Sequence, residues 1–230
     1  MLFGMLLAYS SASGIPVLMY HEIRTSAKND TELRKDLSCS REHFLQHLDW
    51  INKQGYTTIT TGQLVRYDQS KKYIMLTFDD GRASLNWAAN VLHQRGMVGV
   101  FYINTGAIGT SEHLSKKQIT DMSQIGMEIG SHTVSHCDLR MISRKQLTYE
   151  LTQSKRVLEE LISRSIESLA YPSGRYNQKV IKSVKESGYL TARTTEFGVH
   201  YGKNNYKIPV IRIHPTTTTR DLVQIERYGL

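Results

Sequence analysis

Short apolar runs alternate along this chain with stretches whose apolar residues recur at helical spacing. The runs at 73–76 and 97–103 are almost uninterrupted, which is typical of strands buried on both faces, as in a parallel sheet. Between such runs, Phe44, Leu48 and Ile51 recur every three or four residues, which predicts a helix with one buried face. The pattern therefore predicts an α/β protein in which strands and helices follow one another.

The predicted elements alternate with short connections. Strands are predicted at 15–20, 56–60, 73–76, 97–103, 127–131, 166–171, 189–193 and 208–213. Helices are predicted at 41–54, 61–67, 83–94, 115–124, 144–161, 178–187 and from 219 to the end, with Ser40 and Ser143 as N-caps. The segment between the first strand and residue 38 is polar without an apolar period, which predicts a surface loop. This alternation implies a parallel sheet, either doubly wound or closed into a barrel.

The composition is that of one soluble globular domain. Of the 230 residues, 40% are hydrophobic and 22% are charged, and no repeat or low-complexity linker divides the chain. The net charge of +8 favours anionic surfaces such as envelope polymers or lipid headgroups, but the basic residues are scattered. Because no zinc finger, RNA-binding signature or basic arm is present, nucleic acid is not expected as a partner.

Residues 1–14 form a short apolar run followed by small residues, like the core and cleavage region of an export signal, although the positively charged start is missing. The run is too short to span a bilayer, which takes about 20 residues. We therefore expect a domain at 15–230 after an export-signal-like or anchoring segment. The protein is expected to be secreted or peripherally associated with the cell envelope. Cys39 and Cys137 are the two cysteines, and the sequence leaves open whether they pair.

Two adjacent acids, Asp79 and Asp80, follow the apolar run at 73–76 and are followed at once by Gly81. Neighbouring side chains on a strand point to opposite faces, so both carboxylates can reach one site only where the strand ends. Gly81 supplies the backbone freedom for a sharp exit. Such acids at the carboxyl end of a barrel strand are where α/β enzymes hold their chemistry, although D-D-G is also common in turns.

A pair of histidines follows the strand predicted at 127–131. His132 and His136 are spaced to place two imidazoles on one face, and with Asp80 they would form a site with a coordination position open for water. Two histidines and one aspartate accept zinc, cobalt, nickel or iron. The alternative is a pair of solvent-facing loop residues. Cys137 adjoins His136 and is expected to pack away from such a site.

Three segments resemble, in order, the motifs of the NodB-homology polysaccharide deacetylases, carbohydrate esterase family 4: T-F-D-D-G at 77–81, H-T-V-S-H at 132–136 and Y-P-S-G-R-Y-N at 171–177. The opening V-L-M-Y-H-E-I at 17–23 is similar to the subgroup that N-deacetylates poly-β-1,6-N-acetylglucosamine. The resemblance covers residues 15–215. It implies a distorted (β/α) barrel of about seven parallel strands, shorter than eight full repeats. It also implies one divalent metal at the strand ends, with zinc expected before cobalt, nickel or iron.

The resemblance assigns a role to each matching residue. Asp79 would be the general base, and Asp80, His132 and His136 would be the metal ligands. The backbone N–H of Ser173, in the third motif, would stabilise the oxyanion.

Two histidines compete for the role of the acid that protonates the leaving amine. The resemblance favours His21, because an early M-Y-H segment is typical of the subgroup whose motif order is permuted. His214, in I-R-I-H-P, lies where many family members carry a late histidine, and it is the alternative.

The third motif departs from the family at one position. Many members have an arginine two residues before the proline, which orients the base, but this chain has Ala170 there. Arg175 could substitute for it or be a solvated loop charge, or Asp79 could be oriented differently. Tyr171 and Tyr176 could stack on sugar faces, or they could belong to the core.

The combined motifs predict a hydrolase that removes N-acetyl groups from N-acetylglucosamine residues of an extracellular or envelope polysaccharide. Poly-β-1,6-N-acetylglucosamine is the first candidate. The alternatives are deacetylation of chitin or peptidoglycan, O-deacetylation of acetylxylan, and a non-catalytic module that binds polysaccharide. The metal centre would be the same in each enzyme, so the sequence does not separate these substrates.

Overall fold

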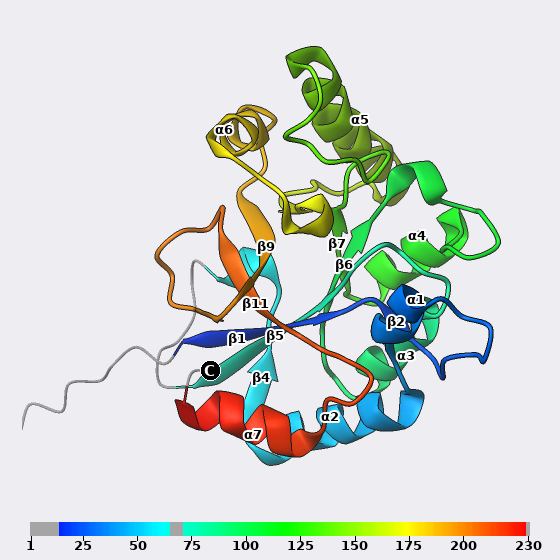
Figure 1. The fold of residues 1–230 in the computed structure, drawn as a ribbon, viewed down its shortest axis with the longest axis vertical. Coiled ribbons are helices and arrows are strands. Elements are labelled where there is room, and N and C mark those ends of the chain that lie inside the picture. The colour runs from blue at the N-terminus through cyan, green and yellow to red at the C-terminus, as the bar shows by residue number, and fades with distance from the viewer. Residues whose placement is uncertain (1–13, 65–70, 229–230) are drawn as a thin grey trace, which may run out of the picture.

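Seven parallel strands close into a barrel in the computed structural model, which describes residues 14–64 and 71–228 (Figure 1). The barrel closes because the first strand pairs in parallel with two strands from distant parts of the chain, β5 (Lys72–Phe78) on one side and β11 (Ile208–Arg212) on the other. The doubly wound alternative is therefore wrong, and the barrel is confirmed. In order around the ring the strands are β1 (Ile15–Tyr20), β5 (Lys72–Phe78), β6 (Val100–Ile103), β7 (Glu128–Ser131), β8 (Ser168–Ala170), β9 (Thr191–Phe197) and β11 (Ile208–Arg212).

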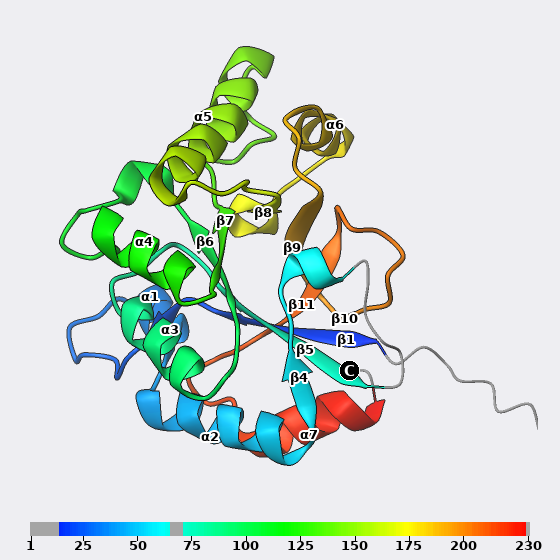
Figure 2. The ribbon, with the colours of Figure 1, turned by 180° about the vertical axis from the view of Figure 1, so that it is seen from behind.

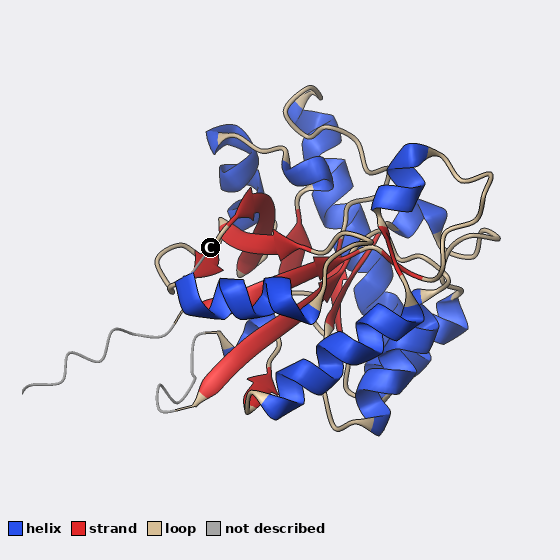
Figure 3. Cartoon of the chain, turned by 60° about the horizontal axis from the view of Figure 1, so that its bottom comes forward, coloured by secondary structure: helices blue, strands red, loops and turns tan. Residues whose placement is uncertain are grey.

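Six longer helices lie outside the strands (Figures 2 and 3). The N-caps predicted for the first and the longest of them are confirmed: Ser40 accepts the backbone N–H of His43, and Ser143 accepts that of Gln146. The last helix, α7 (Thr219–Tyr228), lies beside α2 (Arg41–Lys53) (Figure 1). The helices are α2 (Arg41–Lys53), α3 (Leu85–Gln94), α4 (Lys116–Gln124), α5 (Arg144–Ile162), α6 (Gln178–Glu186) and α7 (Thr219–Tyr228).

Some short elements differ from the prediction. The expected surface loop before residue 38 contains β2 (Glu22–Ile23) and α1 (Glu32–Asp36), and β3 (Ser38–Cys39) begins where it ends; all three are too short to show an apolar period. The strand predicted at 56–60 is β4 (Tyr56–Thr58), which extends the sheet beside β5, and β10 (Val199–His200) was not predicted. In place of the helix predicted at 61–67 there is a 3₁₀ turn at Thr61–Gln63, and residues 65–70 lie outside the described residues.

The apolar runs are explained by two cores, one on each face of the sheet. Val17 and Met19 belong to a cluster inside the barrel, whereas Leu18 and Tyr20 belong to the larger cluster between the barrel and the helices. Because successive side chains of a strand point to opposite faces, a strand between two cores needs apolar residues at every position.

The described residues bear on some of the predictions made for the chain as a whole and not on others. The segment predicted as an export signal or anchor, residues 1–14, lies outside the described residues except for Gly14. No helix in residues 14–64 and 71–228 is long and apolar enough to cross a membrane. The thiols of Cys39 and Cys137 are not bridged to each other.

Candidate active site at the carboxyl ends of the strands

The residues that follow the carboxyl ends of the barrel strands surround one cavity of about 430 Å³. This placement follows from the fold, since parallel strands bring their carboxyl ends to the same rim. Of the predicted site residues, Tyr171 and Arg175 are not part of the cavity wall. The lining residues are His21, Leu33, Leu37, Asp79, Asp80, Arg82, Asn104, His113, His132, His136, Ser173, Thr195 and Arg212.

The predicted metal ligands lie together in this cavity. Asp80 Oδ1 is 3.5 Å from the Nε2 atom of His132 and 3.5 Å from that of His136. One ligand atom from each of the three residues lies within 4.8 Å of the other two. Their donor set of two imidazole nitrogens and one carboxylate oxygen leaves a position for water, as in catalytic zinc sites. The residues therefore fit a divalent metal.

A hydrogen bond behind His132 sets which ring nitrogen is available. Its Nδ1 lies 2.8 Å from the carbonyl oxygen of Ala170 and must carry a proton to bond to it. The Nε2 lone pair is then free to face Asp80, and such a bond behind a ligating imidazole fixes both the tautomer and the ring orientation.

The backbone at two of these ligands is strained. Asp80 and His136 have φ angles of 68° and 56°, in the left-handed region that residues other than glycine rarely adopt. Gly81, predicted to give a sharp exit from the strand, has a φ of 65°. Such strain persists only where surrounding contacts hold it, and it gathers at functional sites.

The titratable groups of the triad influence one another. Burial, together with the neighbouring His132, lowers the pKa of His136, so its ring favours the neutral form that binds metal. Burial opposes ionisation of Asp80, but His132 and then the charges of His21 and His136 outweigh it and hold the pKa of Asp80 below its usual value. Burial opposes protonation of His132, but the hydrogen bond to Asp80 and the charges of Asp79 and Asp80 outweigh it and raise the pKa of His132, so a bound cation would have to displace a proton from this ring.

Asp79 is held by a residue that sequence reasoning missed. The guanidinium of Arg193, on β9, donates from Nη2 to Asp79 Oδ2, and both side chains are almost completely buried. Arg193 Nη1 also donates to the carbonyl oxygen of Thr194, 2.8 Å away, and the guanidinium lies 5.2 Å from the ring centroid of Tyr102. A single arginine in an otherwise uncharged strand run was the available sequence signal. Asp79 is thus oriented across the barrel interior.

Arg175 does not take that role, so the suggested substitution is wrong. Its Nη1 lies 3.3 Å from Asp138 Oδ2, and 56% of its side chain is exposed. The 3₁₀ turn at Pro172–Gly174 leads the chain away before Arg175, so its side chain reaches the loop that follows His136 and not Asp79.

The two candidate acids lie in different places. His21 Nε2 is 3.8 Å from Asp79 Oδ2, with 12% of the side chain exposed, and burial lowers the pKa of His21 against the opposing pull of Asp79 and Asp80. His214 is 47% exposed, contacts Asp36 Oδ1 at 2.9 Å, and does not line the cavity. The geometry places His21, and not His214, beside the carboxylates.

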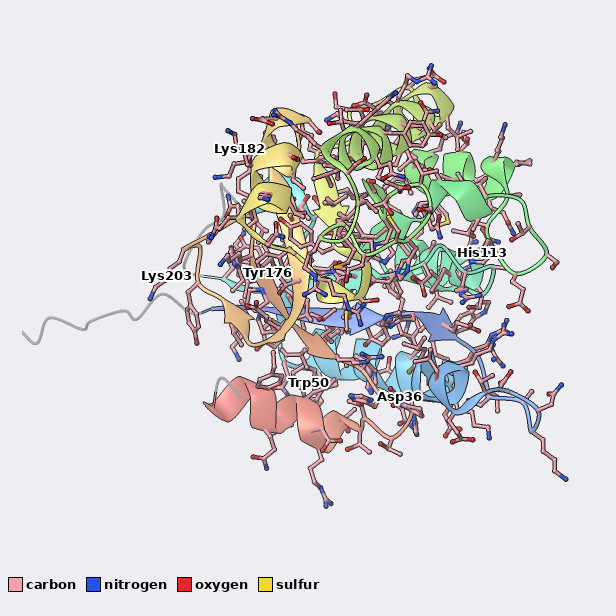
Figure 4. All side chains as sticks on the ribbon, turned by 45° about the horizontal axis from the view of Figure 1, so that its top comes forward. Asp36, Trp50, His113, Tyr176, Lys182 and Lys203 are labelled. Carbon is pink, nitrogen blue, oxygen red and sulfur yellow. The ribbon has the colours of Figure 1, made fainter. Side chains whose placement is uncertain are left out.

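The third motif divides between the cavity and the core. Ser173 lines the cavity with a φ of 53°. Tyr171 is 1% exposed and donates its hydroxyl to the carbonyl oxygen of Tyr206 at 3.2 Å, so it has no face for a sugar. Its ring stacks on Tyr176 at 5.0 Å, and Figure 4 shows Tyr176 on the opposite side of the view from the cavity residue His113.

Unpaired polar atoms gather at the cavity. Of the nine buried side-chain polar atoms without a hydrogen bond in the described residues, five belong to cavity residues. Since native proteins pair almost all buried polar groups, a concentration of unpaired ones indicates that a ligand or water completes them. The five atoms are His21 Nδ1, Asp79 Oδ1, Arg82 Nε, Asn104 Oδ1 and Arg212 Nε.

Known proteins resemble this chain in sequence and in structure. The family model for polysaccharide deacetylases matches residues 66–192, more than half of the chain. A Bacillus subtilis (strain 168) protein classed with the polysaccharide deacetylases is 29% identical over 208 residues, 87% of this chain and 72% of that protein. The poly-β-1,6-N-acetyl-D-glucosamine N-deacetylase of Staphylococcus epidermidis is 23% identical over 235 residues, 90% and 81% of the two chains. The solved Streptococcus pyogenes deacetylase PplD, in complex with acetate, matches with a TM-score of 0.84 and 29% identity, covering 92% of this chain and 97% of that chain.

Proposed function

We propose a substrate, a metal dependence and residue roles for this chain, which belongs to the polysaccharide deacetylase family and is a deacetylase hydrolase. Its reaction is the removal of N-acetyl groups from N-acetylglucosamine residues, with poly-β-1,6-N-acetylglucosamine as the substrate. It depends on one divalent metal, zinc first and cobalt, nickel or iron as alternatives.

One observation carries this proposal, the division of labour between two adjacent carboxylates. Asp80 Oδ1 faces the ring nitrogens of His132 and His136 at 3.5 Å each. Asp79 instead accepts a hydrogen bond from Arg193, and its Oδ1 has no hydrogen-bond partner among the described residues. One acid is therefore placed to hold a cation, while the other keeps an oxygen free to accept a proton.

The residues act in sequence on the acetamide. A metal held by Asp80, His132 and His136 would polarise the carbonyl and make water more acidic. Asp79, fixed by Arg193, takes the proton of the attacking water as the new carbon–oxygen bond forms.

Collapse of the tetrahedral carbon breaks the carbon–nitrogen bond. The proton that Asp79 has taken from water passes to His21, whose Nε2 lies 3.8 Å from Asp79 Oδ2, and His21 gives a proton to the departing nitrogen, which leaves as the free amine of glucosamine. The other product is acetate. The backbone N–H of Ser173, on the cavity wall, serves the oxyanion.

The choice of polymer rests on two observations. The M-Y-H segment places its histidine, His21, in the cavity beside the base, and the Staphylococcus epidermidis relative is named for poly-β-1,6-N-acetyl-D-glucosamine. Action outside the cytoplasmic membrane, secreted or at the cell envelope, is proposed from the apolar first residues together with a polymer of that location.

A substrate panel tests the proposal. Metal-stripped protein is incubated with β-1,6-linked N-acetylglucosamine oligomers, chitin oligomers, peptidoglycan and acetylxylan, with and without zinc, cobalt, nickel or iron, and free amine and acetate are measured. We expect free amine from the β-1,6 oligomers, lost with chelator and restored by metal. Turnover of chitin or peptidoglycan alone would overturn the proposed choice of polymer. Release of acetate without amine, from acetylxylan, would overturn the specificity for N-acetyl groups. Turnover in the presence of chelator would overturn the dependence on a metal.

A further inference from the structure

Helix α5 carries a carboxylate on its buried face. Glu150 is 7% exposed and lies between the buried residues Leu147 and Leu151. A buried carboxylate is costly unless hydrogen bonds satisfy it, so its partners decide why it is there.

Glu150 binds the short loop that joins the two histidine ligands. Its Oε2 accepts the backbone N–H groups of Val134 and Ser135 at 2.8 and 2.9 Å, and its Oε1 accepts the Ser135 hydroxyl at 2.6 Å. Bonds to an ionised carboxylate are about twice as strong as neutral ones. His132 and His136 are the residues at the two ends of this loop.

The other side of the same loop is held by the turn after β6. The carbonyl oxygen of Val134 accepts the N–H of Gly106 at 2.8 Å, and that of Thr133 accepts the N–H of Thr105 at 3.1 Å. A Cβ on Gly106 would lie 2.5 Å from the Val134 oxygen, so only glycine allows this approach. The loop is thus held from the helix on one side and from the turn on the other.

Strain makes these contacts necessary. Thr133 and His136 have φ angles of 65° and 56°, a conformation that costs free energy and relaxes when its supports are removed. A change in either angle would swing the imidazole of His136 relative to that of His132, and their Nε2 atoms would no longer converge on Asp80.

We propose that Glu150 is a positioning residue for the metal centre, acting through the backbone of residues 133–136. The inference rests on the proposed function only in that the triad binds a divalent metal. The hydrogen bonds of Glu150 go to Val134 and Ser135 and not to the three ligand side chains. Its role is to keep the loop in the conformation in which both imidazoles face one point.

The test measures metal affinity directly. Cobalt is titrated into the metal-free full chain in competition with a chelating indicator, and the visible absorption of bound cobalt reports the coordination. We expect Glu150→Ala to weaken cobalt binding about 10- to 100-fold, the range for groups that support metal ligands from behind, and to change the absorption bands. Glu150→Gln keeps one acceptor oxygen for the two N–H groups, so its loss is expected to be intermediate.

Glu159, on the same helix, is a matched control. Its Oε1 accepts the backbone N–H of Ile166 at 3.0 Å, so it also supports a loop from α5, but one that enters the amino end of β8 and is not part of the cavity wall. Glu159→Ala is expected to lower the melting temperature of the metal-free protein as Glu150→Ala does, with unchanged cobalt affinity and spectrum.

The outcomes separate the two proposals. Wild-type cobalt affinity and spectrum in Glu150→Ala, or in Glu150→Gln if the alanine variant does not fold, would overturn the positioning role while leaving the metal centre in place. If Glu159→Ala lost as much cobalt affinity, the loss would reflect the stability of the fold in general, and the positioning role of Glu150 would be overturned as well. A wild-type protein that binds no divalent metal would overturn both proposals.

Discussion

The two ends of the barrel use carboxylates in opposite ways. At the amino end, Glu128 begins β7 and accepts hydrogen bonds from the N–H and hydroxyl of Thr61 and from the hydroxyl of Ser168, so both of its oxygens are occupied. At the carboxyl end, Asp79 has one oxygen on Arg193 and the other without a partner among the described residues. A fully bonded acid can only stabilise the fold, whereas an acid with a free oxygen can exchange a proton.

The two ends of the barrel also differ in backbone strain. Five described residues other than glycine have positive φ, and four of them, Asp80, Thr133, His136 and Ser173, lie in loops at the carboxyl end. The fifth, Ser163, is the C-cap of α5. Among the described residues, backbone strain therefore gathers at the rim where the candidate chemistry is.

The largest effect is expected from neutralising the carboxylate of Asp79, whose Oδ1 has no hydrogen-bond partner among the described residues. Asp79→Asn keeps the size of the side chain but cannot accept a proton at neutral pH, so kcat should fall about 10²- to 10⁴-fold. Metal affinity should stay at the wild-type value, because Asp79 is not among the ligands. Kinetics and a metal titration on the same preparation check both. Full activity would show that the free oxygen has no catalytic role, and the functional contrast between Asp79 and the fully bonded Glu128 would no longer hold.

The two candidate acids provide the next test. His21→Asn should lower kcat about 10²-fold or more, because the leaving amine loses its proton donor. His214→Asn, at an exposed ion pair with Asp36, should leave kcat and KM unchanged. Parallel steady-state assays compare them. The reverse ranking would move the acid away from the cavity residue and contradict its placement beside Asp79.

The amino end should respond in stability alone. Glu128→Ala leaves the N–H of Thr61 without its acceptor, which should lower the free energy of unfolding by about 1–3 kcal/mol. Urea denaturation measures this value, and kcat/KM at a temperature where the variant is folded should match the wild type. A large loss of kcat/KM in the folded variant would mean that the two ends are coupled.

The smallest effect is expected from a buried titratable residue that is fully hydrogen-bonded and is not part of the cavity wall. His47 is buried with both ring nitrogens bonded, Nδ1 to the Tyr20 hydroxyl at 3.1 Å and Nε2 to the Thr217 carbonyl oxygen at 3.0 Å. Burial lowers the pKa of His47 in the folded protein. The unfolded chain therefore binds more protons, so this contribution to stability is present above about pH 6.5 and is lost as pH falls toward the folded pKa.

Urea denaturation of wild type and His47→Gln across that pH range isolates the contribution, at about 1.4 kcal/mol for each unit by which the folded and unfolded pKa values differ. The wild type should lose more stability than the variant on acidification. Equal pH slopes would show that His47 does not titrate in the fold.

Much of the fold and of the metal centre was accessible from the sequence because those features are local. The strand at β1 and the N-caps Ser40 and Ser143 depend on residues within one element, and the structure has them as predicted. Asp80, His132 and His136 could be grouped because each follows a strand, and parallel strands end at one rim.

The contacts that hold these residues in place could not be predicted from local sequence patterns. Arg193 is 114 positions from Asp79 and reaches it across the barrel interior, and Glu150 meets Ser135 from a helix whose sequence shows only an acid between leucines. Arg175 was a reasonable substitute by proximity in the chain, but the turn before it directs it to Asp138.

The sequence by itself determined the order of strands and helices, the two-sided burial of the strands and the set of chemical groups at their ends, since these follow from periodicity and residue type. Periodicity left an open sheet and a barrel as alternatives, and the motifs left two candidate acids. The tertiary structure decided that the sheet closes, that the guanidinium beside the base comes from β9, and that His21 lies with the carboxylates while His214 does not. The reason is physical: propensity acts between near neighbours, whereas the pairing of buried charges and the orientation of strained loops depend on contacts between segments that only folding brings together.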